Sequence, residues 1–368
     1  MISTKTAWQP VAHSYITDTV LRERIDTDGF CVHGRLSEAS LNELKSLFAS
    51  THHFENGEGG MFYSVYSQDL VYRRKMHDEI GAILKSYLDQ WLTDYKMMLN
   101  SYIVKASGPR SEFYVHQDTT GLDEFKYSPL SLWIPLEDIT AENGAMCVMP
   151  GSHKLFSPYR SISFPAPYDD IHFAVRRYLQ PLFMKAGDIL VFDNRIVHNS
   201  MQNLSGKERV VVISGIFPNE AKLQTCWKNP AIPDAKIEVI QHSDDYLLTN
   251  PNFLIDCHAR PSVGDTVALV EDEWPKITET EFTALCEEHG IAPVNYLNEN
   301  GHTDCNMIVE PVSQPIVSVE IPAVEASQPE VAVGRLKDLV GIDARGARER
   351  RTGPGRASLL VAATCRFY

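Results

Sequence analysis

The sequence predicts an α+β protein in which N-terminal helices precede a β-rich core, an antiparallel sandwich or jelly roll. Residues 1–100 are mostly helical in pattern, with apolar side chains at helical spacing. From 100 to 217, short runs rich in β-branched and aromatic residues alternate with turns that contain Gly and Pro. Helices followed by strands, without alternating βαβ units, are typical of helices packed on one face of an antiparallel β core.

Two amphipathic helices are expected before the core. The first begins at Ser37, a favourable N-cap, and places Leu41, Leu44 and Phe48 on one face. The second is expected over 77–99, where apolar residues again recur at intervals of three and four. Each helix therefore has an apolar stripe that can cover a sheet.

Six strand-like runs make up the predicted core, which extends over about 100–220. They are 101–106, 112–116, 130–136, 145–150, 188–193 and 209–217. Residues 218–305 have a mixed pattern, but a further helix is expected over 279–290, with Gly290 just past its end.

The composition changes after residue 305. Residues 308–333 contain four Pro and four Glu and no Lys or Arg, and the regular Pro would interrupt a β ladder. Residues 344–356 are basic and rich in Gly. We therefore expect one folded domain over 1–305, followed over 306–368 by a Pro/Val/Glu-rich linker and a basic disordered tail.

Charge and composition exclude several classes of protein. With 34 Lys and Arg against 48 Asp and Glu, the formal charge is −14, which is a poor match for a nucleic-acid backbone. The chain shows no secretory leader and no apolar run long enough to span a membrane. Its seven Cys form no CxxC pair, as expected of reduced thiols. We expect a cytoplasmic protein that binds a small molecule, and neither nucleic acid nor membrane.

The residues that carry chemistry lie on the predicted strands. His116 and Asp118 are two apart at a strand end, so both can point to one face. A later strand-like run delivers His198, and Arg209 opens the strand that follows. Two imidazoles and one carboxylate match the facial triad of non-haem Fe(II) oxygenases, which leaves three coordination positions open. Arg209 would hold the far carboxylate of a dicarboxylic cosubstrate.

Context distinguishes this His-x-Asp triplet from two others in the chain. The triplets that begin at His242 and His302 are not followed by a strand-borne His and Arg. A single His at a strand end is usually structural, and a motif match by itself is weak. Only the joint pattern of strand, triplet, second His and Arg predicts a metal site.

Three further features have alternative interpretations. Asp193 could orient an imidazole or lie at an exposed strand end. The basic run 73–75 could receive an anionic substrate, although a solvated helix face is favoured. Tyr63, Tyr66 and Tyr72 could line a pocket or belong to the core.

The segment 131–154, SLWIPLEDITAENGAMCVMPGSHK, adds a more specific signal. Together with the triplet, the second His and the Arg, it resembles the phytanoyl-CoA dioxygenase family of Fe(II)/2-oxoglutarate-dependent oxygenases. The resemblance covers about 20–220 and is strongest over 112–217. It implies a double-stranded β-helix, the jelly-roll or cupin-like core, with flanking N-terminal helices, in an oxygenase domain over 1–305.

The resemblance also implies roles for six residues. These are Fe(II) ligation by His116, Asp118 and His198, binding of the 2-oxoglutarate C5 carboxylate by Arg209, and lining of the cosubstrate pocket by Trp133 and Ser200. The implied reaction consumes O2 and hydroxylates a small molecule at an unactivated C–H, releasing succinate and CO2. The alternatives are a jelly-roll binding module without turnover and a non-oxygenase metal enzyme on a cupin-like barrel. The intact ligand set and Arg209 argue against a decayed site.

Overall fold

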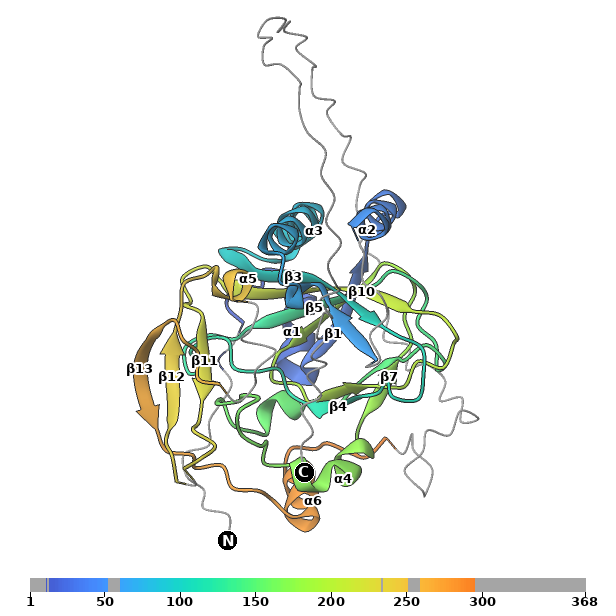
Figure 1. Cartoon of the computed structure of the whole chain (residues 1–368). Coiled ribbons are helices and arrows are strands. Elements are labelled where there is room, and N and C mark those ends of the chain that lie inside the picture. The colour runs from blue at the N-terminus through green and yellow to red at the C-terminus, as the bar shows by residue number, and fades with distance from the viewer. Residues whose placement is uncertain (1–10, 12, 52–59, 233, 251–258, 295–368) are drawn as a thin grey trace, which may run out of the picture.

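The computed structural model contains three antiparallel sheets and six α-helices among the residues it describes (Figure 1). Those residues are 11, 13–51, 60–232, 234–250 and 259–294. The predicted linker and tail, 306–368, lie outside them. Within these described ranges, no helix has the length and apolar character needed to cross a membrane. The mixture of helices with antiparallel sheets confirms the α+β class.

The largest sheet has six strands in the order β1-β8-β5-β10-β3-β2, all antiparallel to their neighbours. Its strands are β1 (Phe30–Arg35), β2 (Met61–Tyr63), β3 (Tyr95–Lys105), β5 (Leu130–Pro135), β8 (Asp188–Asp193) and β10 (Arg209–Pro218). Two of these strands, β1 and β2, precede residue 100, so the sheet recruits segments from outside the predicted 100–220 core.

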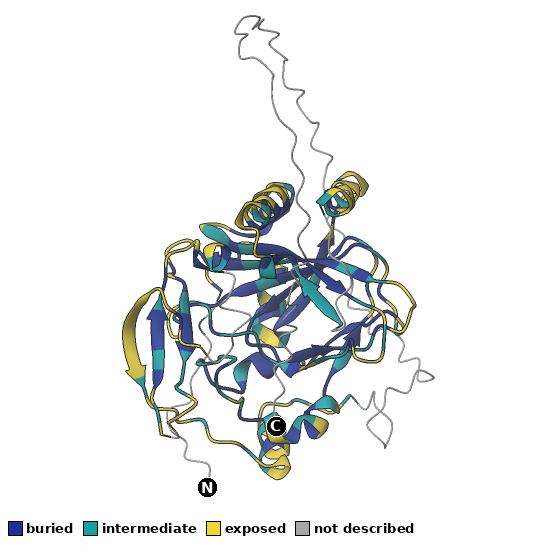
Figure 2. Ribbon diagram, viewed as in Figure 1, coloured by how far each residue is buried: buried dark blue, intermediate teal, exposed yellow. Residues whose placement is uncertain are grey.

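Three helices cover one face of this sheet. They are α1 (Thr19–Asp28), α2 (Glu38–Thr51) and α3 (Leu70–Trp91). Along β5, Leu132 and Ile134 pack toward these helices, whereas Trp133 faces the opposite side of the sheet. This alternation follows from the twofold period of a strand and explains why β5 is apolar throughout. Figure 2 shows that the helices expose only their outward faces.

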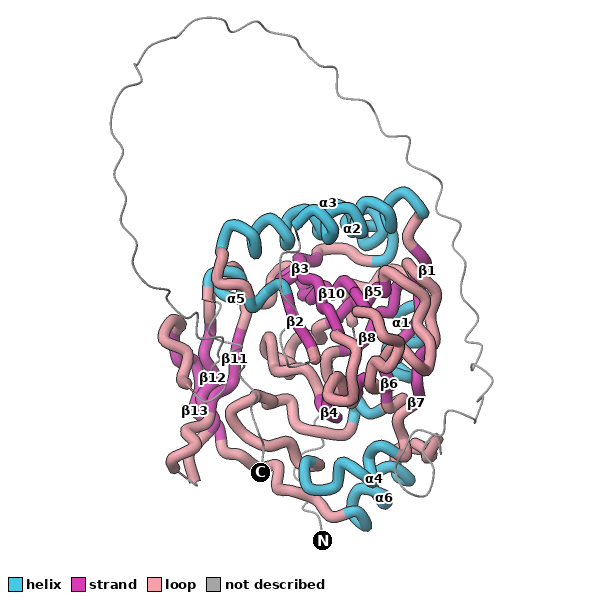
Figure 3. The backbone as a smooth tube through the Cα atoms, turned by 45° about the vertical axis from the view of Figure 1, so that its right-hand side comes forward, coloured by secondary structure: helices cyan, strands magenta, loops and turns pink. Residues whose placement is uncertain are grey.

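A four-stranded sheet of order β4-β9-β6-β7 lies against the other face. Its strands are β4 (Phe113–His116), β6 (Met146–Val148), β7 (Gln180–Leu182) and β9 (His198–Ser200). Met146 and Val148 pack with Trp133 and Leu190 in a shared apolar layer between the two sheets. Figure 3 shows the two sheets in a different orientation, with α4 (His172–Arg176) and α6 (Glu279–Glu288) beyond the smaller one.

The third sheet is formed within 218–305, the segment whose sequence pattern was mixed. It contains β11 (Gln224–Trp227), β12 (Ile237–Gln241) and β13 (Asp265–Val270), with the short α5 (Tyr246–Thr249) nearby. Its strand β13 is at the edge and is largely exposed. The expected helix over 279–290 appears as α6.

The second predicted helix, 77–99, differs most from the structure. The helix α3 begins earlier, where the Asp69 carboxylate accepts the N–H groups of Val71 and Tyr72. It ends at Trp91, and Asp94 adopts a left-handed conformation with φ of 47°. The apolar residues from 95 onward belong to β3 and pair with β10. A short apolar run does not by itself distinguish helix from strand, which is why periodicity extended the helix too far.

Candidate metal site

The antiparallel pairing of β4 with β9 brings together the three predicted metal ligands. His116 and His198 are direct cross-strand partners, and such partners place their side chains on the same face. Asp118 follows β4 by two residues, and its Oδ1 lies 3.9 Å from Nε2 of each His. The candidate donor atoms of the three residues all lie within 4.8 Å of one another. Gln117 instead donates to the Arg195 carbonyl, away from the site.

Backbone carbonyls fix the orientation of both imidazoles. His116 Nδ1 donates to the Tyr114 carbonyl at 2.9 Å, and His198 Nδ1 donates to the Ile196 carbonyl at 3.0 Å. A proton on each Nδ1 leaves each Nε2 lone pair free toward Asp118. Burial, together with the neighbouring His198, holds the pKa of His116 well below its usual range, so the ring is neutral and able to bind a metal.

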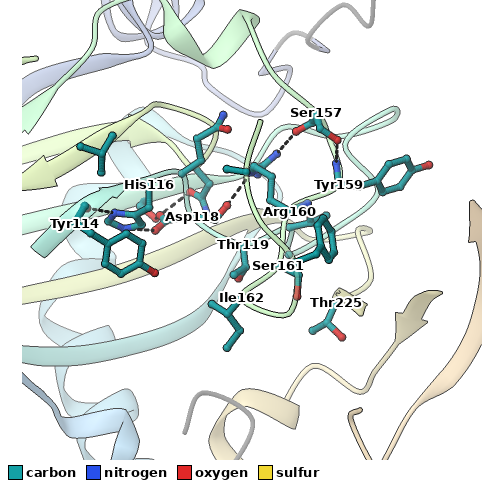
Figure 4. A pocket seen from close by; sticks show the side chains of 18 of the residues that line it. Tyr114, His116, Asp118, Thr119, Ser157, Tyr159, Arg160, Ser161, Ile162 and Thr225 are labelled. Atoms are coloured by element: carbon teal, nitrogen blue, oxygen red, sulfur yellow. Dashed lines mark hydrogen bonds and ion pairs between the residues drawn. The ribbon is translucent and has the colours of Figure 1, made fainter. Parts of the chain in front are cut away.

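Asp118 is held by a second set of contacts, most of them to its backbone. Its backbone N–H donates to the Asn194 carbonyl at 3.1 Å, and Arg160 Nε donates to its carbonyl at 2.8 Å (Figure 4). The Ser131 hydroxyl lies 3.4 Å from its Oδ2. Arg160 is itself fixed by a buried bidentate pair with Glu124, at 2.8 and 2.6 Å. Asp118 is thus positioned by Ser131 of β5 and by the loops that contain Arg160 and Asn194.

Arg209 is a buried cation that forms no ion pair with another residue in the described part of the chain. It is 1% exposed, donates to the Gly144 carbonyl, and its guanidinium lies 5.2 Å from the Trp133 ring. Its Nε has no hydrogen-bond partner, and it forms no ion pair with any described carboxylate. Burial lowers the pKa of Arg209 to about 10. Ser200 lies two residues past His198 in β9 and is therefore on the same face of its strand.

A cavity of about 820 Å³ opens in front of His116 and Asp118, a volume typical of a small-molecule site. Aromatic rings line the side near His116, including Tyr63, Tyr66 and Tyr114. Arg209, Trp133 and Ser200 are not among the lining residues and lie in the layer between the sheets. Tyr63 is near both regions, because Asp118 and Arg209 both influence its pKa, which burial raises.

The remaining predicted features have other roles. Asp193 is fully buried and contacts His13 and Arg195, so it neither lies at an exposed strand end nor holds a metal-site imidazole. Arg73 is buried and donates to the Leu247 carbonyl, contrary to a solvated helix face at that position.

Of the two other His-x-Asp triplets, the structure describes only the one at 242–244, which belongs to no candidate metal cluster among the described residues. His242 contacts the Thr225 hydroxyl at 2.8 Å and stacks on Tyr246, while the triplet at 302–304 lies outside the described ranges.

Some site residues carry no clear sequence signal. Tyr114 precedes His116 by two positions on β4, so strand periodicity alone could have placed it on the same face. Asp169, which also lines the cavity, reaches the site through the packing of a loop and α4 against β4. No local pattern in the sequence indicates that contact.

Comparison with known proteins identifies the family. A family model described as Phytanoyl-CoA dioxygenase (PhyH) matches residues 25–211, just over half of the chain. Phytanoyl-CoA dioxygenase 1 of Oryza sativa subsp. japonica is 36% identical over 116 residues, 29% of this chain and 40% of the rice protein. Ectoine dioxygenase of Nocardia farcinica is 32% identical over 112 residues, 25% of this chain and 38% of that protein. The chain thus spans about 40% of the length of these relatives.

Solved structures of similar proteins include EctD from S. alaskensis with 2-oxoglutarate and 5-hydroxyectoine. It is 18% identical, with a TM-score of 0.43 over 59% of this chain and 83% of that chain. The segment matched by the family model contains His116, Asp118, His198 and Arg209. Because that match extends over just over half of the chain, the chain belongs to the phytanoyl-CoA dioxygenase family of Fe(II)- and 2-oxoglutarate-dependent oxygenases.

Proposed function

We propose that the chain is an Fe(II)- and 2-oxoglutarate-dependent dioxygenase that hydroxylates a small molecule at an unactivated C–H, with release of succinate and CO2. One observation carries this proposal: the donor atoms of His116, Asp118 and His198 converge within 4.8 Å beside a large cavity. Two imidazole nitrogens and one carboxylate oxygen suit Fe(II) with open positions. In this proposal, the two facing sheets are the family's double-stranded β-helix.

The surroundings of Arg209 support 2-oxoglutarate as the cosubstrate. A buried guanidinium that lacks a counter-ion is unfavourable unless a ligand supplies the opposite charge. The far carboxylate of 2-oxoglutarate would do so, and the planar Arg fork matches it in geometry. Trp133 packs against the guanidinium and would fix its orientation, and Ser200 would lie beside the same ligand.

Each group at the site has a separate role, which follows from its position. Iron, when bound, supplies the activation of dioxygen that amino-acid side chains do not provide. The carbonyls of Tyr114 and Ile196 hold the two imidazoles with Nε2 toward the metal position. Arg160 and Ser131 hold Asp118, so the three ligands keep their geometry while substrates exchange.

The test is formation of succinate from 2-oxoglutarate under air by protein loaded with Fe(II). We expect iron-dependent succinate release that His116→Ala abolishes, because a three-ligand site has no spare ligand. His289→Ala, which changes an exposed His at the end of α6, should behave like the unmodified protein and serves as the control. A folded, iron-loaded protein that forms no succinate would support the silent binding module instead.

A further inference from the structure

The cationic side chains that line the cavity already have carboxylate partners. Three cationic side chains among the described residues line it, and each already pairs with a carboxylate: Arg160 with Glu124, Arg176 with Glu112, and Lys276 with Asp170. A phosphate or carboxylate on an entering substrate would therefore find no unpaired described cation on this wall and would have to displace an existing partner.

Asp169 offers a negative charge in the same cavity. This residue lines the cavity at the start of the 3-10 turn Asp169–Ile171, which leads into α4. Its Oδ2 accepts the N–H of Ala166 at 2.9 Å, but it forms no ion pair with any described cation. Burial raises the pKa of the Asp169 carboxyl, and the charge of Lys276, which is paired with Asp170, offsets that effect only in part. Asp272, which also lines the cavity, is by contrast paired with Lys228 at 2.9 Å.

An aromatic ring that lines the same cavity as Asp169 lies beside the metal site. The ring of Tyr114 is 5.1 Å from that of His116, and both Asp169 and Asp118 act on its pKa, which burial raises. Tyr114 is 49% exposed and lines the cavity. A carboxylate and an aromatic ring that line one cavity can together bind an ammonium group, through ion pairing and cation–π attraction.

An ion pair ties the helix that follows Asp169 to the segment before the metal-site strand. Arg176 on α4 pairs with Glu112, directly before β4, which ties α4 to the strand that carries His116. The distance from the carboxylate to the metal site is therefore set by folded elements rather than by a free loop.

We propose that the substrate of this site carries a positively charged amine, which pairs with Asp169 against the Tyr114 ring while the carbon to be hydroxylated lies at the His116–Asp118–His198 end. The inference rests on the proposed oxygenase function and specifies the class of substrate. By the same reasoning, the described residues that line the cavity should bind phosphate esters and free carboxylates poorly.

The experiment compares three probes of similar shape and different charge: 2-phenylethylamine, 2-phenylethanol and 3-phenylpropionate. Binding is measured by calorimetry to protein loaded with Ni(II) and 2-oxoglutarate, which does not turn over. We expect the amine to bind about 10-fold more tightly than the alcohol, and the carboxylate to bind most weakly. Asp169→Asn should remove this preference, whereas Asp170→Asn, at the exposed and already paired neighbour, should retain it.

Several results would overturn the inference. They are failure of the amine to bind, tighter binding of the carboxylate, and an amine preference that survives Asp169→Asn. Because the measurement needs no turnover, it is separable from the oxygenase proposal. Iron-dependent succinate formation without amine preference would overturn only the substrate class. An amine preference that depends on Asp169, in a protein without succinate formation, would retain the binding inference and overturn the oxygenase proposal.

Discussion

Replacing Arg209 by methionine should change the stability of the protein little and lower its affinity for 2-oxoglutarate strongly. Burial lowers the pKa of Arg209 from 12.5 to about 10, which corresponds to about 3 kcal/mol of unfavourable charge burial at neutral pH. Methionine has a comparable length, but it loses the bond to the Gly144 carbonyl, about 1.5–3 kcal/mol, and the contact with Trp133, about 0.5–2 kcal/mol. These contributions nearly cancel.

The free energy of unfolding of Arg209→Met should therefore lie within about 2 kcal/mol of the wild-type value. The affinity for 2-oxoglutarate should change far more, because removing one partner of a desolvated charge pair costs about 2–5 kcal/mol, or about 30- to 4,000-fold in Kd. Arg209→Lys should restore only part of the affinity, since an ammonium retains the charge but not the planar fork.

Urea denaturation of the metal-free protein measures the first quantity, and calorimetric titration of 2-oxoglutarate into Ni(II)-loaded protein measures the second. The matched control is Arg73→Met. Arg73 is also buried and bonded to backbone carbonyls, but it lies outside the candidate site, so its replacement should leave the Kd unchanged. An Arg209→Met protein with wild-type affinity would refute the reasoning, as would a loss of stability well above about 3 kcal/mol, typical of a broken buried ion pair.

Three other predictions concern stability and the tail. Burial lowers the pKa of His13, but the hydrogen bonds of its ring, above all to Asp193, outweigh burial and raise the pKa overall. The charged form of His13 therefore stabilises the fold below about pH 6.5, and this stabilisation is lost as the pH rises through the pKa of His13 in the folded protein. The difference in unfolding free energy between wild type and His13→Gln should thus be larger at about pH 6 than at about pH 9, and equal differences in urea titrations would contradict it. Glu124→Gln should destabilise the protein by about 3–5 kcal/mol, because it leaves Arg160 buried without its counter-ion, and an unchanged urea midpoint would show that the pair does not stabilise the fold. Removing 306–368 should leave the melting temperature and succinate formation unchanged, since the Pro-rich composition predicts no strand there, and an insoluble or inactive truncated protein would contradict this.

Much of the site could be predicted because its chemistry depends on local sequence. The twofold period of a strand puts His116 and Asp118 on one face, and a second β run carries His198 to the neighbouring strand. The role of Arg209 was inferred from the chemistry of its guanidinium and from resemblance, and those of Trp133 and Ser200 from resemblance alone. All three roles remain predictions. The environment of Asp193 could not be predicted, because its partner His13 comes from a distant segment with no recognisable pattern.

Elements of the fold could be predicted where an apolar pattern repeated over many residues and turn residues marked its ends. The strand β8 matches the predicted 188–193, and α2 begins directly after Ser37, whose hydroxyl accepts the Ser40 N–H at 3.1 Å. The strands β1 and β2 were missed because each pairs with residues far along the chain, and β2 has only three residues. Such long-range pairing contributes little to a local pattern.

The central claim is that His116, Asp118 and His198 form one Fe(II) site that also binds 2-oxoglutarate. Anaerobic addition of Fe(II) and 2-oxoglutarate, followed by the metal-to-ligand charge-transfer absorbance, tests it most directly, because the absorbance requires both components at one site. The matched variants are Asp118→Ala and Asp244→Ala, which remove the carboxylates of two His-x-Asp triplets, only the first of which lies in the site. We predict one iron per chain and a charge-transfer band in wild type and Asp244→Ala, and loss of both in Asp118→Ala. An unchanged band and iron content in Asp118→Ala would contradict the assignment.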